Sequence, residues 1–270
     1  LAEDFRRTVA SSSGSSVVCV SWTRRELTYR IDVAGSEKTP VDSEFTAIEA
    51  AFSSWQILSD RCSDFRLIRG ERITKPTIGK GTEVDNVLTF REKFCRDVVA
   101  NADPCFTDST CGNKYFCWDH SDGTIGLTTL TYSTKSGVIL DADIEFNAAG
   151  FNMTTISSPP CEPGQENGLC AAYDVQNTAT HEIGHVIGLD HVDNPSSTMA
   201  ATASVGEIGK RVIDPGTAEG FCLTYPKAQP TRSCDELASI PRKIKGTTIG
   251  CNTAFTEPSV YWLLGLVTAG

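Results

Sequence analysis

The stretch His181-Glu182-Ile183-Gly184-His185-Val186-Ile187-Gly188-Leu189-Asp190-His191 holds three of the four histidines of the chain. Residues four apart lie on one face of a helix, so His181 and His185 can direct their imidazole rings toward one point. His191 cannot share that face, so the helix must end before it. Gly188 is suited to the turn that would bring the chain back. The spacing predicts a helix, a turn and three converging imidazoles.

Three neutral imidazole nitrogens leave one position open on a tetrahedral metal ion, which is typical of a catalytic rather than a structural zinc site. Zinc in such a site lowers the pKa of its water ligand to about 7. Glu182 would take a proton from that water as general base and later deliver it to a leaving amine. The residues therefore predict peptide bond hydrolysis, with Glu182 as the catalytic residue and His181, His185 and His191 as metal ligands.

The composition restricts the class of protein. The formal net charge is −10, so the chain has no basic stripe to neutralise the phosphates of nucleic acid or an anionic membrane surface. Its 270 residues, 40% of them hydrophobic, can bury a sizeable core. We expect protein or peptide substrates, no nucleic acid, no cofactor beyond the metal, and a monomer.

The chain has eleven cysteines and no Cys-x-x-Cys pair, which indicates a disulfide framework and a secreted or surface-attached protein. No signal-peptide pattern opens the chain, so we expect that one was removed or that the chain is a fragment. Connectivity cannot be fixed from sequence, and proximity alone suggests these pairs: Cys19 with Cys62, Cys95 with Cys117, Cys105 with Cys111, Cys161 with Cys170, and Cys222 with Cys234.

Apolar periodicity predicts a mixture of strands and helices. The expected strands cover residues 17–22 continuing through 27–31, then 65–68, 86–90, 125–132 and 138–146. The expected helices are one built on Phe45 to Trp55, one that Asp174 caps and that carries the first two histidines, and one from Asp214-Pro215 to Tyr225.

The expected organisation is one main domain with less regular ends. Residues 1–16 include a serine and glycine run and predict a flexible leader. The domain covers 17–226, with a cysteine-rich insert at 95–117 that disulfides would have to hold. Residues 227–250 turn polar and basic and predict a linker.

Further motifs flank the histidine stretch. Met199 follows the third histidine in Ser-Thr-Met-Ala, residues 22–31 read Trp-Thr-Arg-Arg-Glu-Leu-Thr-Tyr-Arg-Ile, residues 51–55 read Ala-Phe-Ser-Ser-Trp, and residues 223–226 read Leu-Thr-Tyr-Pro. The histidine stretch with Met199 as a Met-turn resembles the metzincin metalloproteases. The flanking segments resemble the matrixins within that clan, over about residues 17–226.

The resemblance implies an α+β domain: a twisted five-stranded mixed sheet, three main helices and, here, disulfide-rich loops. It implies one antiparallel edge strand, placed at residues 125–132, that pairs with extended substrate through Leu127, Thr128 and Thr129. Residues after Met199 would line the pocket for the side chain that follows the scissile bond. The implied function is a secreted zinc endopeptidase. A different reading is a catalytically silent zinc-containing binding module, although such a module has no need of Glu182.

Three features depart from the matrixin pattern. Only His120 remains for the structural zinc that matrixins usually carry, so we expect disulfides in its place. Val192 stands where matrixins often have serine. Cys19 lacks the Pro-Arg-Cys-Gly setting of a matrixin cysteine switch; it is either in a disulfide or a thiolate ligand in a latent form.

Several acidic residues have two interpretations. Asp141, Asp143 and Glu145 alternate with apolar residues, and they could either bind Ca²⁺ or face solvent from a half-buried strand. Asp190 and Asp193 could support the ligand histidines or cap loops.

Residues 251–270 begin with Cys251 and end in an apolar run. About a dozen apolar residues cannot span a bilayer, which needs roughly twenty. A cysteine, a spacer and an apolar run resemble certain bacterial C-terminal surface-sorting signals, so we expect a truncated anchor with Cys251 as the unpaired thiol. The alternative is an element that packs on the domain.

Overall fold

A five-stranded mixed sheet forms the centre of the domain. The computed structural model describes residues 5–13, 16–79, 86–162, 164–165, 169–239 and 263–269. The five strands, in their order across the sheet, are β5 (Arg66–Arg69), β4 (Glu26–Ile31), β6 (Asn86–Phe90), β8 (Ile139–Phe146) and β7 (Thr124–Tyr132). The first four run parallel, and β7 is antiparallel to β8. The predicted sheet and its antiparallel strand are confirmed, but β7 is not an edge strand, because residues 263–269 pair with its other side.

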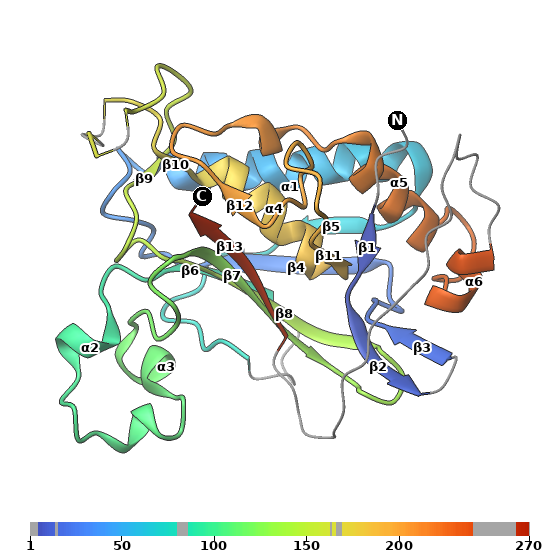
Figure 1. The fold of residues 1–270 in the computed structure, drawn as a ribbon, viewed down its shortest axis with the longest axis horizontal. Coiled ribbons are helices and arrows are strands. Elements are labelled where there is room, and N and C mark those ends of the chain that lie inside the picture. The colour runs from blue at the N-terminus through green and yellow to red at the C-terminus, as the bar shows by residue number, and fades with distance from the viewer. Residues whose placement is uncertain are drawn as a thin grey trace.

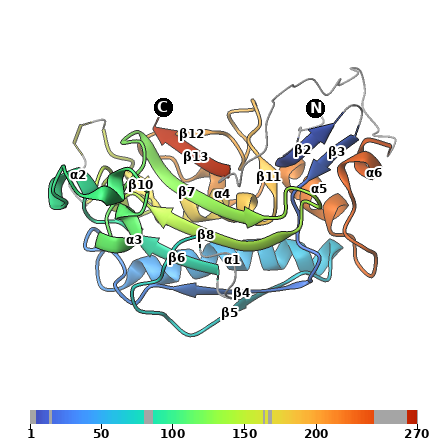
Figure 2. The ribbon, with the colours of Figure 1, turned by 90° about the horizontal axis from the view of Figure 1, so that it is seen from below.

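Three main helices complete the core, as predicted. They are α1 (Ser43–Cys62), α4 (Val175–Val186) and α5 (Pro215–Thr224). α1 and α4 pack against each other over one face of the sheet (Figure 1; Figure 2). Trp55 of α1 is fully buried and donates from its indole nitrogen to the Thr180 carbonyl of α4 at 2.9 Å. This bond fixes α4, and hence its histidines, against the longest helix.

The cysteine-rich insert forms a small satellite cluster. It contains α2 (Cys95–Val98), the short 3₁₀ turn η1 (Pro104–Phe106) and α3 (Cys111–Tyr115), which lie to one side of the sheet (Figure 1). Disulfides join Cys95 to Cys117 and Cys105 to Cys111, and all four cysteines are buried together with Val99. The structure therefore has these two expected pairs, and also Cys161–Cys170.

The prediction of a flexible leader is wrong for the part that the structure describes. β1 (Arg6–Arg7) pairs with β11 (Leu189–Asp190), and β2 (Val9–Ser13) forms a hairpin with β3 (Ser16–Cys19). The predicted continuous strand from residue 17 to residue 31 is also divided, into β3 and β4. The reason lies at Trp22, whose backbone N–H donates to the Tyr225 hydroxyl rather than to a neighbouring strand.

Two expected disulfide pairs are wrong, because the fold joins segments that are far apart in sequence. Cys19 is bonded to Cys234, and Cys62 to Cys222. α6 (Cys234–Ser239) packs against β3, so residues 227–239 are attached to the domain rather than forming a linker. The disulfide also removes the alternative that Cys19 is a free thiolate ligand. Residues 240–250 and Cys251 lie outside the described part of the chain.

The acidic residues of β8 are buried, so the interpretation that they face solvent is wrong. Asp143 accepts hydrogen bonds from the Gly79 and Val87 amides at 2.7 and 2.9 Å. Glu145 forms a buried ion pair with Arg91 at 2.6 Å. Asp141 is 4% exposed. Gly79, Val87 and Arg91 supply these partners, which alternation along β8 alone did not indicate. Calcium binding stays a prediction.

Two more strands extend the sheet beyond β7. β13 (Leu263–Ala269) pairs antiparallel with β7, and β12 (Thr202–Ala203) pairs parallel with β13. Residues 263–269 thus lie in the sheet, which agrees with the alternative that the C-terminal segment packs on the domain. Surface anchoring stays a prediction. Two-residue strands β9 (Met153–Thr154) and β10 (Tyr173–Asp174) and the turn η2 (Gly209–Arg211) complete the described elements.

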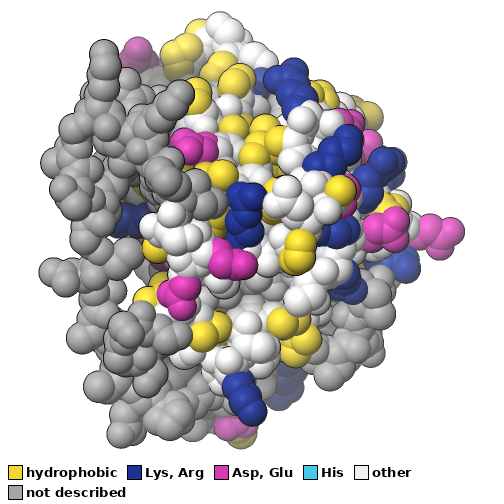
Figure 3. Space-filling model, turned by 90° about the vertical axis from the view of Figure 1, so that its right-hand side faces the viewer, with side chains coloured by type: hydrophobic (Ala, Val, Ile, Leu, Met, Phe, Trp, Pro, Cys, Tyr) yellow, Lys and Arg dark blue, Asp and Glu magenta, His cyan; other side chains and the backbone are white. Residues whose placement is uncertain are grey.

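No helix among the described residues is both long and apolar enough to cross a membrane. The face in Figure 3 shows hydrophobic side chains in small separate groups among charged and polar ones. Such scattered apolar side chains are ordinary for a surface in contact with water.

Candidate metal centre and active site

Helix α4 begins and ends at residues suited to those positions. The Asp174 side chain accepts from the Asn177 amide at 2.7 Å, which caps the first turn, and Arg211 forms an ion pair with the same carboxylate. After Val186 the chain turns at Gly188, whose φ is 89°. A Cβ there would lie 2.6 Å from the Val20 carbonyl oxygen. Only glycine fits this turn, and the turn returns the chain toward the helix, as predicted.

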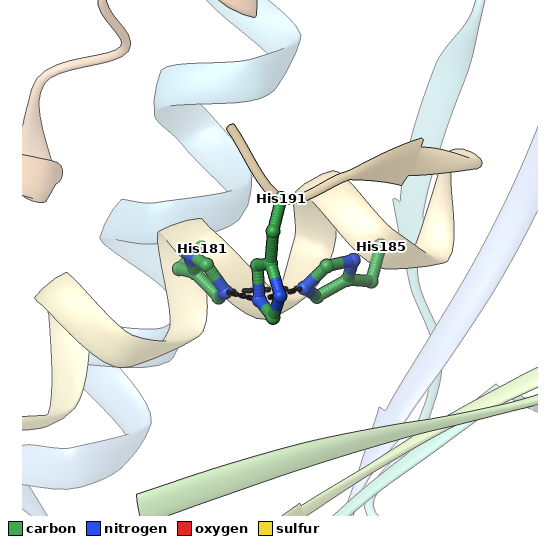
Figure 4. A group of neighbouring side chains, drawn as sticks. All are labelled: His181, His185 and His191. Atoms are coloured by element: carbon green, nitrogen blue, oxygen red, sulfur yellow. Dashed lines mark hydrogen bonds between the residues drawn. The ribbon is translucent and has the colours of Figure 1, made fainter. Parts of the chain in front are cut away.

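The three histidines converge. The Nε2 atoms of His181, His185 and His191 are 3.1 Å apart in each of the three pairs (Figure 4). His181 Nδ1 donates to the Thr198 carbonyl at 2.6 Å, and His185 Nδ1 donates to the Leu189 carbonyl at 2.8 Å. These bonds place the ring proton of both histidines on Nδ1, so both Nε2 atoms present a lone pair to the same point.

Electrostatics keep the triad neutral. Burial, followed by the neighbouring histidines, lowers the pKa of His181 well below its ordinary value, and burial lowers the pKa of His185 to about 3. Burial also lowers the pKa of His191. Lone pairs on neutral rings at 3.1 Å repel unless a cation lies between them, and zinc accepts imidazole nitrogen at about 2.0–2.1 Å. The donor set fits zinc, and within the described chain it is the one group of three or more such residues.

Glu182 lies beside the triad in a fully buried position. Its Oε2 accepts a hydrogen bond from the Thr128 hydroxyl of β7 at 2.6 Å, while its Oε1 is buried without a hydrogen-bond partner. Burial raises the pKa of Glu182 to about 8, and the Thr128 hydrogen bond opposes this rise. A Cβ on Gly126 would lie 2.9 Å from Oε1, so the backbone of β7 passes directly over the carboxylate.

The Met-turn lies beneath the histidines. Met199 is 1% exposed, and a Cβ on Gly184 would lie 2.2 Å from its sulfur. Gly184 therefore lets the turn approach the helix between the two ligand histidines. The Asp214 carboxylate accepts from the Ser197 hydroxyl at 2.8 Å and from the Thr198 amide at 2.7 Å. The same carboxylate caps α5 by accepting from the Gly216 and Thr217 amides, so Asp214 joins the Met-turn to the start of that helix.

Some of the other candidate residues contact Glu182 or a ligand histidine, and others do not. Thr128 reaches the site through Glu182, whereas Leu127 and Thr129 are placed only by strand pairing along β7. Asp190 accepts from the His191 amide at 2.8 Å and so supports a ligand residue. Asp193 forms an exposed ion pair with Arg6. His120 contacts Glu145 at 3.1 Å, away from the triad.

A mixed five-stranded sheet, a helix with two convergent histidines and a methionine turn beneath them define the metalloprotease class of fold. Residues 21–215 match the model of the Matrixin family, Peptidase M10, and the chain belongs to that family. Its members are zinc-dependent endopeptidases. The chain is also similar to Metalloendoproteinase 2-MMP of Arabidopsis thaliana, with 32% identity over 114 residues. That match covers 40% of this chain and 26% of the Arabidopsis protein.

Proposed function

We propose that this protein is a secreted or surface-attached zinc endopeptidase in which His181, His185 and His191 hold one zinc ion and Glu182 is the general base. The observation that carries the proposal is the arrangement of the triad. Two of its rings are fixed by Nδ1–H bonds to backbone carbonyls, and all three Nε2 atoms lie 3.1 Å from one another. Membership of the matrixin family supports it independently.

When bound, zinc would supply Lewis-acid activation of water and stabilise negative charge on the carbonyl oxygen under attack. Glu182 has one oxygen held by Thr128 and the other without a hydrogen-bond partner. Oε1 is therefore the atom that takes a proton from the attacking water while the C–O bond forms. It passes that proton to the amine nitrogen as the C–N bond breaks.

An extended peptide would bind by adding a strand to β7, through residues 127–129. Strand addition suits a protease because the backbone supplies the hydrogen bonds for any sequence. Residues just after Met199, which include β12, would border the pocket for the side chain that follows the scissile bond. The five disulfides among the described residues support a site of action outside the cytoplasm.

The rival function is a zinc-containing binding module that cuts nothing. A module without catalysis has no use for a buried carboxylate that Thr128 holds beside the triad. We expect Glu182→Ala to lower the rate of casein hydrolysis by about 10²–10⁴-fold, the usual effect of losing a general base. Zinc content, measured by atomic absorption, should stay at the wild-type level.

The matched control is Glu219→Ala, which removes an exposed glutamate from α5 and should leave both readouts unchanged. Casein hydrolysis that survives Glu182→Ala would refute the mechanism. Loss of zinc together with activity would instead show that Glu182 holds the metal site together.

A further inference from the structure

The edge of the sheet where substrate would add is already paired within this chain. β13 lies along the outer side of β7, in the same plane as the sheet (Figure 1; Figure 2). Its other side pairs with β12, so β13 lies between two strands. An open strand at this edge would expose unpaired N–H and C=O groups, and β13 supplies their partners.

The register brings β13 to the candidate catalytic residue. Gly265 lies opposite Thr128, whose hydroxyl donates to Glu182. Val267 lies opposite Gly126, the residue whose backbone passes over Glu182 Oε1. β13 also contacts α4, the helix that carries Glu182. Thus the middle of β13 passes the carboxylate, and Glu182 is fully buried in a structure that includes this strand.

We propose that residues 263–269 inhibit the protease in cis by occupying the position of the substrate strand. This inference rests on the proposed function. β13 makes the backbone pairing with β7 that an added peptide would make, and it also pairs with β12. A substrate strand therefore has no position between β7 and β12 until β13 leaves. Activity would require release of residues 263–269 or their removal by another protease.

Proline substitutions that disrupt the pairing of β13 with β7 test the proposal in the full chain. Both residues lie opposite β7, and neighbouring residues of a strand direct their N–H groups to opposite sides, so Gly265→Pro with Leu266→Pro removes one N–H group that faces β7 whichever of the two supplies it. The matched control, Gly265→Ala with Leu266→Ala, keeps both N–H groups. We expect kcat/KM for a fluorogenic peptide to rise about tenfold in the proline variant and to stay at the wild-type level in the alanine variant. A tenfold effect follows from a tethered segment at about 1 mM effective concentration with a Kd of ~0.1 mM.

Hydrogen exchange gives a readout independent of activity. In the wild type, alternate amides of β7 should be protected by β13, and the proline variant should lose that protection while β8 keeps its own. A synthetic peptide with the sequence Leu-Leu-Gly-Leu-Val-Thr-Ala should inhibit the proline variant competitively.

The outcomes separate the two proposals. Equal hydrolysis by all three proteins would overturn inhibition by β13 and leave the proposed function intact. Cleavage between residues 263 and 269 during the assay would also overturn it, because the segment would then be a substrate. Absence of hydrolysis in every zinc-loaded variant would overturn the proposed function and the inhibition together.

Discussion

Thr128 Oγ1 donates a hydrogen bond of 2.6 Å to Glu182 Oε2, and the Glu182 backbone carbonyl oxygen lies 3.1 Å from the same hydroxyl. The pair joins the middle of β7 to the helix that carries two of the three histidines. It fixes one carboxylate oxygen, while the other, Oε1, is buried without a hydrogen-bond partner. The strand that would bind substrate therefore also positions the base.

Thr128→Val removes this hydroxyl while keeping the size of the side chain. We expect kcat to fall by about 10–100-fold, because the Thr128 hydrogen bond opposes the rise that burial causes in the pKa of Glu182, and its loss leaves less of the carboxylate ionised to act as base. Zinc content should not change, since Thr128 does not touch the triad. Steady-state kinetics on a peptide substrate checks the effect. Thr128→Ser, which keeps the hydroxyl, is the control and should retain most of the activity; a valine variant as active as the serine variant would contradict this role.

Gly184→Ala tests the close approach of the Met-turn to α4. The new Cβ would lie 2.2 Å from the Met199 sulfur, so either the helix or the turn must move. We expect a loss of about 1–3 kcal/mol in the free energy of unfolding and weaker zinc binding, because overpacking shifts the two ligand histidines. Urea denaturation and a zinc competition assay would measure both.

Gly123→Ala is the matched control, because a Cβ at Gly123 meets nothing within 4 Å. Adding Met199→Ala to Gly184→Ala should restore part of the lost stability, since it removes the sulfur that clashes. If Gly184→Ala alone binds zinc and unfolds as the wild type does, the Met-turn does not set the geometry of the triad.

The features that the sequence predicted are those that depend on residues close together along the chain. The triad, the end of α4 and the strand at residues 86–90 follow from spacing and local propensity, and the structure has them. The Cys19–Cys234 disulfide and β13 join segments far apart in sequence, which proximity along the chain cannot reveal. The Thr128–Glu182 bond depends on how β7 is placed against α4, and no local pattern carries that information.

The interpretation that the acidic residues of β8 face solvent was wrong, and their burial leads to a prediction of pH dependence. Alternation suggested that Asp143 faces solvent, but burial and the neighbouring Asp141 raise its pKa well above the ordinary value. The folded protein then holds a proton that the unfolded chain releases at an ordinary carboxyl pKa of about 4. The contribution of Asp143 to stability is therefore present below that value and is lost as pH rises toward its folded pKa.

We expect Asp143→Asn to flatten the fall of the unfolding temperature over this pH range, which scanning calorimetry would measure. Addition of calcium provides a second experiment with the same two proteins. If Ca²⁺ binds at Asp141 and Asp143, as one interpretation of the sequence predicts, it should raise the unfolding temperature of the wild type at neutral pH and not that of Asp143→Asn. Equal pH slopes in the two proteins would show that Asp143 is ionised in the folded state throughout.

The most direct test of the central claim is zinc titration of chelator-treated protein with casein hydrolysis as the readout. The convergence of His181, His185 and His191 on one point predicts no hydrolysis in the metal-free protein. Activity should return in proportion to added zinc and saturate at one zinc per chain, and His191→Ala should abolish this return. Full hydrolysis by the metal-free protein would contradict the assignment.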